Sequence, residues 1–173
     1  MPEEIVIISS GIIKKKKMNI FILDENQTTC AKYHCDKHVV KMILETAQLL
    51  CGVHWINGNE AAYKLSHKNH PCSIWTRECI ENYIWLCKLG LELCSEYTYR
   101  YNKIHKSQKI IEWCCSNLPN IKSNNGNITQ FALAMPNEFK VDCKIQSYRN
   151  YYKGAKTSIA NWKNRETPQW FLN

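Results

Sequence analysis

The N-terminal part of the sequence contains no hydrophobic segment long enough to cross a membrane and no secretion signal. Its apolar segment at residues 5–13 is shorter than the roughly 18 residues that a membrane-spanning helix needs. Glu3 and Glu4 precede this segment, at the place where a secretion signal carries basic residues. We therefore expect neither membrane insertion nor secretion.

Cysteine pairs with the spacing of a zinc site are also missing. None of the ten cysteines belongs to a Cys-x-x-Cys pair, and we expect neither a metal nor a cofactor. Cys79 and Cys87 lie inside apolar helical patterns, where a thiol behaves as a small hydrophobe. This usage favours an intracellular, reducing compartment over a disulfide scaffold. The weaker metal alternative is zinc held by Cys30, His34 and His38, which would share one helix face.

Acidic residues are scarce beside basic ones. The chain has 15 Asp and Glu against 23 Lys and Arg, a formal net charge of +8, so nucleic acid is a more natural partner than an acidic protein. The length of 173 residues suits one packed domain. We predict a basic extension at residues 1–17, either disordered or upstream of an original start, and a single monomeric domain at residues 18–173.

Strand patterns are almost absent. One short apolar strand is predicted at residues 19–23, directly after Met18. The 3.6-residue spacing of apolar side chains elsewhere predicts four helices, at residues 28–53, 71–97, 107–114 and 142–162. The predicted fold class is therefore mainly α, a single compact helical domain with a short N-terminal strand.

The stretch HCDKHVVKMILE places many titratable groups on the first long helix. At 100° per residue, His34, His38, Lys41 and Glu45 fall within about 60° of one another, which forms a polar row at the edge of the apolar stripe. Lys37 stands one position closer to solvent. Half-buried groups of this kind can act as acid, base or nucleophile. The alternative is an ordinary boundary row with a Lys41–Glu45 ion pair.

A second polar group precedes the helix predicted to begin at Pro71. His67, Asn69 and His70 lie where free backbone N–H groups and the helix dipole favour a phosphate. Arg77, in the same helix, is a further candidate DNA contact. The alternative is a helix cap made by His70.

The last predicted helix carries cations and aromatic rings together in YRNYYKGAK. Such a stripe, with Tyr152 beside it, is typical of proteins that track a phosphate backbone and stack on bases. Solvated surface lysines are the alternative. Gly154 weakens a helix, and a close approach by backbone or ligand would explain its presence. The basic members of the stripe are Arg149, Lys153, Lys156 and Lys163.

Four motifs, DKHVVKMILETAQLL, YKLSHKNHPCSIWTRE, AMPNEFK and YRNYYKGAK, resemble those of small phage and large-virus proteins grouped with the pyrimidine-dimer DNA glycosylases, the endonuclease V-like family. The resemblance implies an all-helical DNA repair enzyme that cuts the glycosidic bond of a damaged pyrimidine and then nicks the abasic strand. An amine attacks the sugar C1′ to form a Schiff base, and a carboxylate assists. For a viral member, the compartment would be the host cytoplasm or nucleus.

Carried onto this chain, the resemblance and the residue patterns assign two sets of side chains. Characterised members use an N-terminal α-amine, but 17 residues precede Met18 here and the bulk of Asn19 opposes removal of that methionine. Lys41 or Lys37 could supply the amine instead, and Asp36 competes with Glu45 as the carboxylate. The catalytic set is His38, Lys41, Glu45 and His70. The set predicted to bind DNA, most naturally as a duplex, is His34, Lys37, His67, Asn69, Arg77, Arg149, Tyr152, Lys153 and Lys156.

Two other functions are alternatives to the hypothesis of a glycosylase and lyase. One is a non-catalytic nucleic-acid-binding module, in which the polar row is structural. The other is a hydrolase or transferase of nucleotides or modified bases. The enzyme hypothesis requires that residues 34–45 and residues 148–156 face a common groove.

Overall fold

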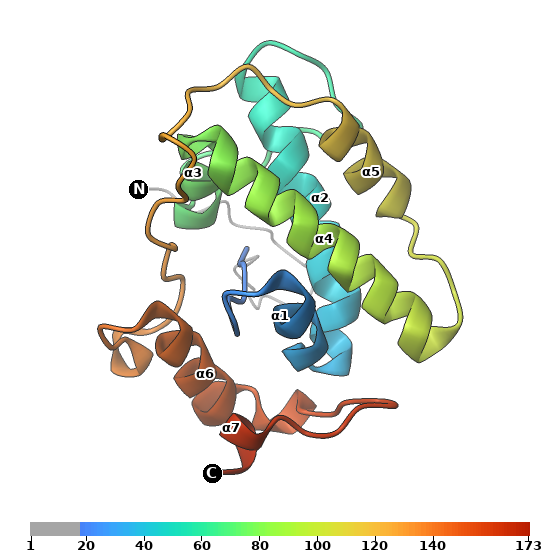
Figure 1. Ribbon diagram of the computed structural model, residues 1–173, viewed down its shortest axis with the longest axis vertical. Helices are drawn as coiled ribbons and strands as arrows, with labels where there is room; N and C mark the ends of the chain where they lie inside the picture. The colour runs from blue at the N-terminus through green and yellow to red at the C-terminus, as the bar shows by residue number, and fades with distance from the viewer. Residues whose placement is uncertain (1–17) are drawn as a thin grey trace, which may run out of the picture.

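The computed structural model describes residues 18–173, and the extension predicted at residues 1–17 lies outside them. These residues form helices and no β-strand, which confirms the mainly α fold class (Figure 1). The elements are α1 (Gln27–Tyr33), α2 (Asp36–Ile56), α3 (Pro71–Glu78), α4 (Ile80–Tyr101), α5 (Gln108–Ser116), α6 (Lys144–Ala155) and α7 (Gln169–Leu172), with 3-10 helices at Asn137–Phe139 and Thr157–Ile159.

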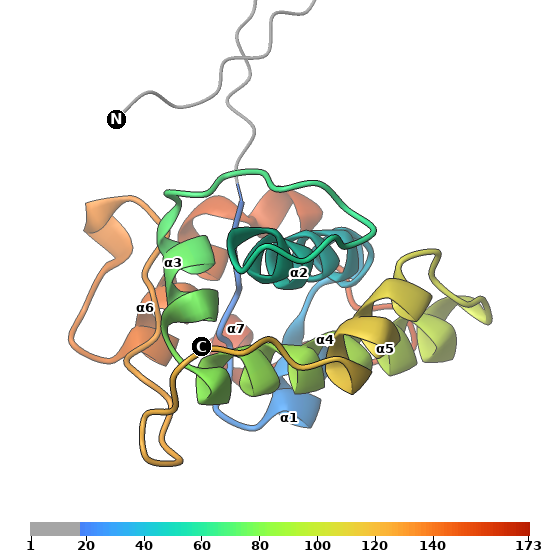
Figure 2. The ribbon, with the colours of Figure 1, turned by 90° about the horizontal axis from the view of Figure 1, so that it is seen from above.

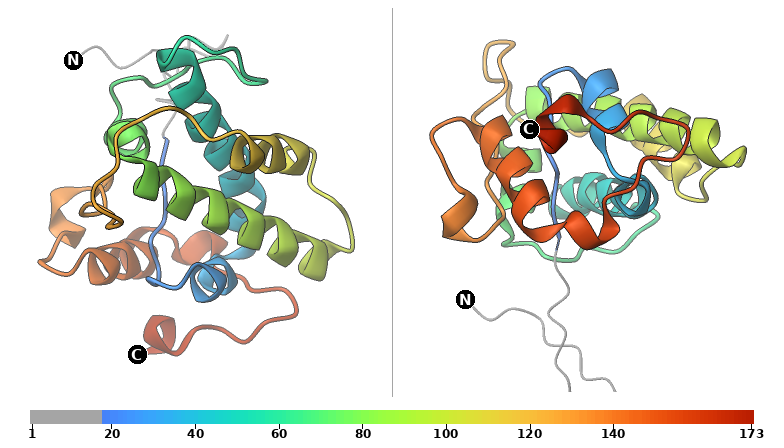
Figure 3. Two further views of the ribbon diagram at one scale, coloured as in Figure 1. Left: turned by 45° about the horizontal axis from the view of Figure 1, so that its top comes forward. Right: turned by 90° about the horizontal axis from the view of Figure 1, so that it is seen from below.

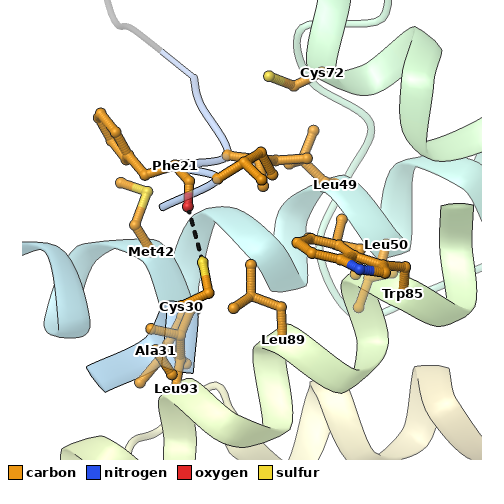
Figure 4. Close-up of a cluster of buried hydrophobic side chains, with 14 of the residues drawn as sticks. Phe21, Cys30, Ala31, Met42, Leu49, Leu50, Cys72, Trp85, Leu89 and Leu93 are labelled. Atoms are coloured by element: carbon orange, nitrogen blue, oxygen red, sulfur yellow. Dashed lines mark hydrogen bonds between the residues drawn. The ribbon is translucent and has the colours of Figure 1, made fainter. Parts of the chain in front are cut away.

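The strand predicted at residues 19–23 is wrong. The segment runs through the middle of the fold beside α2 and α3 (Figure 2), and Leu23 is fully buried. Its backbone groups bond to side chains instead of to a second strand. The Cys30 thiol donates to the carbonyl oxygen of Phe21 at 3.3 Å (Figure 4), and Arg149 Nε donates to that of Leu23 at 3.0 Å. An apolar pattern thus marked a buried segment, but no neighbouring strand exists to make it a sheet.

The two longest helices, α2 and α4, cross and form the centre of the core (Figure 1). Gly90 of α4 allows the close approach, because a Cβ there would lie 2.9 Å from Thr46 Cγ2 of α2 and 3.1 Å from Ile111 Cγ2 of α5. By length and composition α2 could cross a membrane, but 67% of its most apolar window is buried inside the fold. It is the core helix of this domain.

The helix predicted over residues 28–53 is broken at His34 and Cys35, both in extended conformation. Groups distant in sequence replace the missing helical hydrogen bonds. Arg100 Nη1 donates to the carbonyl oxygen of His34 at 2.8 Å, and the backbone N–H of Asp36 donates to that of Asn161 at 2.8 Å. The break separates α1 from α2 and moves His34 off the α2 face.

Two of the later predicted helices also differ from the prediction, whereas the one predicted at residues 107–114 is present as α5. The one beginning at Pro71 is broken at Cys79, where the N–H of Ile80 donates to the carbonyl of Lys122 at 2.9 Å. The last helix, α6, ends at Ala155. Beyond it the chain passes across α1 and α2 (Figure 3, right).

Gly154 in α6 is explained by a neighbouring side chain. A Cβ at this position would overlap the ring of Phe139, which packs against the helix backbone. The close approach expected from the sequence is therefore real, and its partner is an aromatic ring of the same chain.

Candidate active site

Glu45 is a buried carboxylate on α2. Its residue surface is only 6% exposed, yet one oxygen accepts a hydrogen bond from the backbone N–H of Asn19 at 3.3 Å. The other oxygen lies 3.4 Å from Lys41 Nζ, whose side chain is 56% exposed. The predicted Lys41–Glu45 pair is therefore present, and it joins the buried carboxylate to the surface.

Asn19 is the centre of a polar group that the sequence patterns did not reveal. Its side-chain oxygen accepts from Tyr148 Oη at 3.2 Å and from the Cys72 thiol at 3.8 Å, while its Nδ2 donates to the Ala134 carbonyl at 2.8 Å. Elements α2, α3 and α6 thus meet here. We call Asn19, Glu45, Cys72 and Tyr148 the Asn19 cluster. The only sequence signal for it was the apolar segment that begins at Met18.

The thiol in this cluster is not a nucleophile. Burial raises the pKa of Cys72 to about 12, and the nearby Glu45 carboxylate contributes in the same direction. A protonated thiol neither attacks carbon nor binds metal well. This excludes Cys72 from the candidate reactive groups.

Asp36, the competing carboxylate, accepts hydrogen bonds from other parts of the fold. Arg100 Nη1 donates to its Oδ1 at 3.0 Å, and the backbone N–H of Lys163 donates to the same oxygen at 2.8 Å. Both interactions hold chain segments together at the start of α2. The geometry therefore favours Glu45 as the reactive carboxylate.

His38 connects α2 to α6. Its Nδ1 lies 2.6 Å from Tyr152 Oη, and its ring stacks on Phe21 with centroids 4.2 Å apart. The Tyr152 oxygen also accepts from the N–H of Cys35 at 3.4 Å. Burial lowers the pKa of His38 to about 2, with further lowering by His34, Lys156 and Lys41. The ring is neutral near pH 7.

His34 does not belong to the polar row, and its placement there is wrong. It caps the C-terminus of α1, and its Nδ1 donates to the Cys30 carbonyl at 2.7 Å. Burial lowers its pKa to about 4. At 0% exposure the side chain has no surface with which to contact DNA, because the helix break before Asp36 turns it into the core.

Arg149 also faces inward. Its guanidinium bonds to the Leu23 carbonyl and to Asp24 Oδ2 at 3.3 Å. It also lies 5.6 Å from the ring centre of Tyr33 and 5.3 Å from that of Trp170. Arg149, the first cation of the stripe predicted on α6, is therefore engaged in contacts within the fold.

The predicted lysines lie nearer the surface. Lys37 and Lys153 are exposed, and Lys153 Nζ bonds to the carbonyl oxygen of Asn173. Lys156 is half-buried, with its Nζ 4.7 Å from the ring centre of Tyr151. Lys41 of α2 and Lys156, the residue that follows α6, both lower the pKa of His38, so both cations lie near that ring. Tyr152 itself is fully buried.

The group before α3 forms a helix cap. His70 is the N-cap residue, and its Nδ1 accepts from the N–H of Cys72 at 3.1 Å. Asn69 is exposed, and Arg77 Nη1 donates to the Lys68 carbonyl at 2.6 Å. His67 has a left-handed backbone with φ of 52°, a strained conformation for a residue other than glycine. The cap alternative is confirmed, and His70 reaches the Asn19 cluster through Cys72.

Comparison with known families decides the family. The model of the pyrimidine dimer DNA glycosylase family matches residues 18–109. The chain belongs to the pyrimidine dimer DNA glycosylase family. Neither curated proteins nor solved structures gave a match. Membership indicates DNA glycosylase activity in DNA repair, with DNA as the substrate. The matched region of this glycosylase begins at Met18 and contains Asn19, Glu45 and His70.

Proposed function

We propose that this glycosylase cuts the glycosidic bond of a damaged pyrimidine through a Schiff base and then nicks the abasic strand, with Glu45 as the assisting carboxylate. The supporting observation is the contact between Glu45 and the backbone nitrogen of Asn19, 3.3 Å apart. A buried carboxylate beside a nitrogen can hold an attacking amine in place and accept its proton.

The chemistry requires an amine that forms a bond to the sugar C1′ as the damaged base leaves. The product is an aminal, whose C1′–O4′ bond then breaks as a proton passes from the amine nitrogen to O4′ and an imine forms. The imine makes the C2′ hydrogen acidic, and loss of that proton expels the 3′ phosphate. Glu45 is the group that accepts protons in these steps. Two of its contacts mark candidate nucleophiles: the side-chain amine of Lys41, and the backbone nitrogen of Asn19, which is an amine only in a chain that begins at this residue.

Of these two we propose the nitrogen of Asn19, although the bulk of this residue opposes removal of Met18 alone, so the chain would have to be cleaved between Met18 and Asn19 by another route. In a chain form that begins at this residue, its nitrogen would carry a free amine beside the Glu45 carboxylate. Lys41 was expected to react only if burial favoured its neutral form, but its side chain is 56% exposed. Lys41 instead supplies positive charge next to the carboxylate, and Lys37 lies further out on the exposed face of α2.

Borohydride trapping on DNA with an abasic site tests this assignment. The test uses four proteins: the full chain, the form beginning at Asn19, and the Lys41→Arg variant of each. Each is incubated with the DNA and borohydride, and the trapped complex is digested so that mass spectrometry can locate the adduct. We expect the adduct on the Asn19 amine of the shorter form, with Lys41→Arg still trapped. An adduct on Lys41 would move the nucleophile there. No adduct in any form would reject Schiff-base chemistry.

The working context is part of the same proposal. The protein would act as a monomer on duplex DNA inside a reducing compartment. For a viral protein, this compartment would be the cytoplasm or the nucleus of the host cell. All ten cysteines are free, and eight of them are buried, which suits a compartment that keeps thiols reduced. Sedimentation at micromolar concentration, with and without a DNA duplex, tests the monomer and its substrate together.

A further inference from the structure

Three polar side-chain atoms beside the first turn of α3 are buried without a hydrogen-bond partner. They are Ser66 Oγ, His67 Nδ1 and Ser73 Oγ, and residues 18–173 contain only two other such atoms. Ser73 is 8% exposed. An unpaired buried hydroxyl is costly and calls for a physical explanation. A cluster of them indicates that this place receives something polar.

The two serines line one narrow hollow between α2 and α3. Its polar wall consists of Gln48, Ser66, Ser73 and Arg77, and its apolar wall of Leu49, Gly52, Val53, Ile56 and Leu65. At its floor the hollow admits a single group of about the size of a water molecule, and its mouth is open. It therefore suits one oxygen atom of a larger ligand, whose remainder would lie outside.

The hollow lies next to the Asn19 cluster. Gln48 follows Glu45 by three residues on the same face of α2, a rise of about 4.5 Å. Ser73 follows Cys72, whose thiol contacts Asn19 at 3.8 Å. A ligand that reaches Glu45 with its sugar would thus pass the hollow with a neighbouring group.

The lining selects a negatively charged oxygen. Two hydroxyls and a guanidinium can donate hydrogen bonds, and no carboxylate lines the wall. The wall includes the first turn of α3, where the helix dipole is positive. Hydrogen bonds to a charged oxygen are the stronger kind. A phosphate oxygen satisfies all of these groups, and DNA offers one next to every sugar.

We propose that this hollow binds one non-bridging phosphate oxygen of the DNA strand, adjacent to the sugar held at Glu45, through Ser66 and Ser73 with Arg77 at the rim. The inference depends on the proposed function for the identity of the ligand. It adds a positioning site that fixes the register of the strand relative to the reactive carboxylate.

The first test measures binding of the full chain to a duplex that contains a tetrahydrofuran abasic analogue. This analogue has no aldehyde, so binding is independent of Schiff-base chemistry. We expect Ser66→Ala with Ser73→Ala to weaken binding about 10- to 100-fold, because two hydrogen bonds to a charged group are lost. Thermal stability should hold or rise, since the removed hydroxyls are unpaired. Ser116→Ala on α5, an exposed serine, is the matched control and should change nothing.

The second test locates the phosphate. Neutral methylphosphonates are placed one at a time around the analogue. At one position the substitution should weaken binding of the unmodified protein about tenfold and leave the double serine variant unaffected. Arg77→Gln should also lower the salt dependence of the affinity by about one counterion.

The outcomes separate the two proposals. Equal affinity of the unmodified protein and the double serine variant would overturn the phosphate site and indicate a hollow that holds only water. Absence of any affinity for DNA would overturn it as well. Failure of borohydride trapping, with the serine and methylphosphonate effects intact, would reject the Schiff base and leave the phosphate site standing.

Discussion

Helix α2 takes part in two groups of charged side chains that differ in the exposure of their cations: the Arg100 side chain is fully buried, whereas that of Lys41 is 56% exposed. At its first residue, Asp36 joins Arg100, Glu96 and Arg165, which we call the Arg100 network. Arg100 is 2% exposed, and its Nε, Nη1 and Nη2 all donate, to Glu96, Asp36 and two backbone carbonyls. About two and a half turns along, the partners of Glu45 include an exposed lysine and a backbone N–H.

The difference teaches which charges serve the fold and which are available for chemistry. In the Arg100 network, Arg165 donates to both oxygens of Glu96 at 2.8 and 2.9 Å. Burial acts to raise the pKa of Glu96, but hydrogen bonds from Arg165 and Arg100 outweigh it and leave the pKa lowered. A carboxylate held in this way has no capacity left for a substrate. Glu45 instead contacts a backbone N–H at 3.3 Å and, at 3.4 Å, a lysine whose side chain is 56% exposed, so its surroundings connect it to the surface.

The largest expected effect follows from removal of Arg100. Arg100→Met should lower the free energy of unfolding by about 3–5 kcal/mol, because Glu96 and Asp36 are left as buried or half-buried charges without their main partner. Urea denaturation measures the change. The matched control is Lys88→Met on the same helix, an exposed residue whose loss should stay within about 0.5 kcal/mol. A small effect of Arg100→Met would mean that the network contributes little to the fold.

The opposite pattern is expected at Glu45. Glu45→Gln should slow strand cleavage by about 10²- to 10⁴-fold, because the group that accepts protons is lost, while the free energy of unfolding changes little. Asp36→Asn is the matched control, and it should cost stability and leave the rate intact. Gel assays on damaged duplex and urea denaturation measure both variants. If the two variants behaved alike, the contrast between the two groups would fail.

A third effect appears in the dependence of stability on pH. The pKa of His34 is about 4 in the folded protein and about 6.5 in an unfolded chain. The unfolded state therefore binds more protons between these values. Stability from this group is complete above pH 6.5 and falls by about 3 kcal/mol as the pH drops to 4.

The variant His34→Asn isolates this contribution. An asparagine amide can still donate to the Cys30 carbonyl but does not titrate, so the loss of stability between pH 6.5 and 4 should be shallower. Urea denaturation at half-unit intervals of pH measures the slope. His38 adds to the slope in both proteins, since its pKa is lowered in the same direction. An unchanged slope would show that His34 is not neutral in the folded state.

The sequence predicted the helices better than their ends. Apolar periodicity located the core helices because burial of one face is a local property of the chain. The breaks at Cys35 and Cys79 were missed because neither N-cap residue has a side-chain cap. The groups that satisfy the free backbone there, Arg100, Asn161 and Lys122, are distant in sequence.

The candidate site was predicted in part for the same reason. Lys41 and Glu45 are one helical turn apart, so their pairing follows from spacing alone. Asn19 and Tyr148 belong to segments that meet only in the folded chain, and no local pattern marks them. Arg149 looked like a surface cation, but a carbonyl, a carboxylate and two rings hold it inward.

The smallest effect is expected where α6 meets α2, between the two groups. Tyr152→Phe removes the bond to His38 Nδ1 and should cost about 1–2 kcal/mol of stability, because a buried acceptor loses its donor. Tyr151→Phe, on the same helix, is the matched control and should be nearly neutral. Nitrogen-15 NMR provides the second measurement: with Tyr152 present, we expect the His38 hydrogen on Nε2, and without it the two tautomers should mix. If cleavage activity persists in Tyr152→Phe while this tautomer is lost, His38 and Tyr152 belong with the Arg100 network as supports of the fold. If cleavage falls with the tautomer, the reactive region of α2 extends from Glu45 to His38.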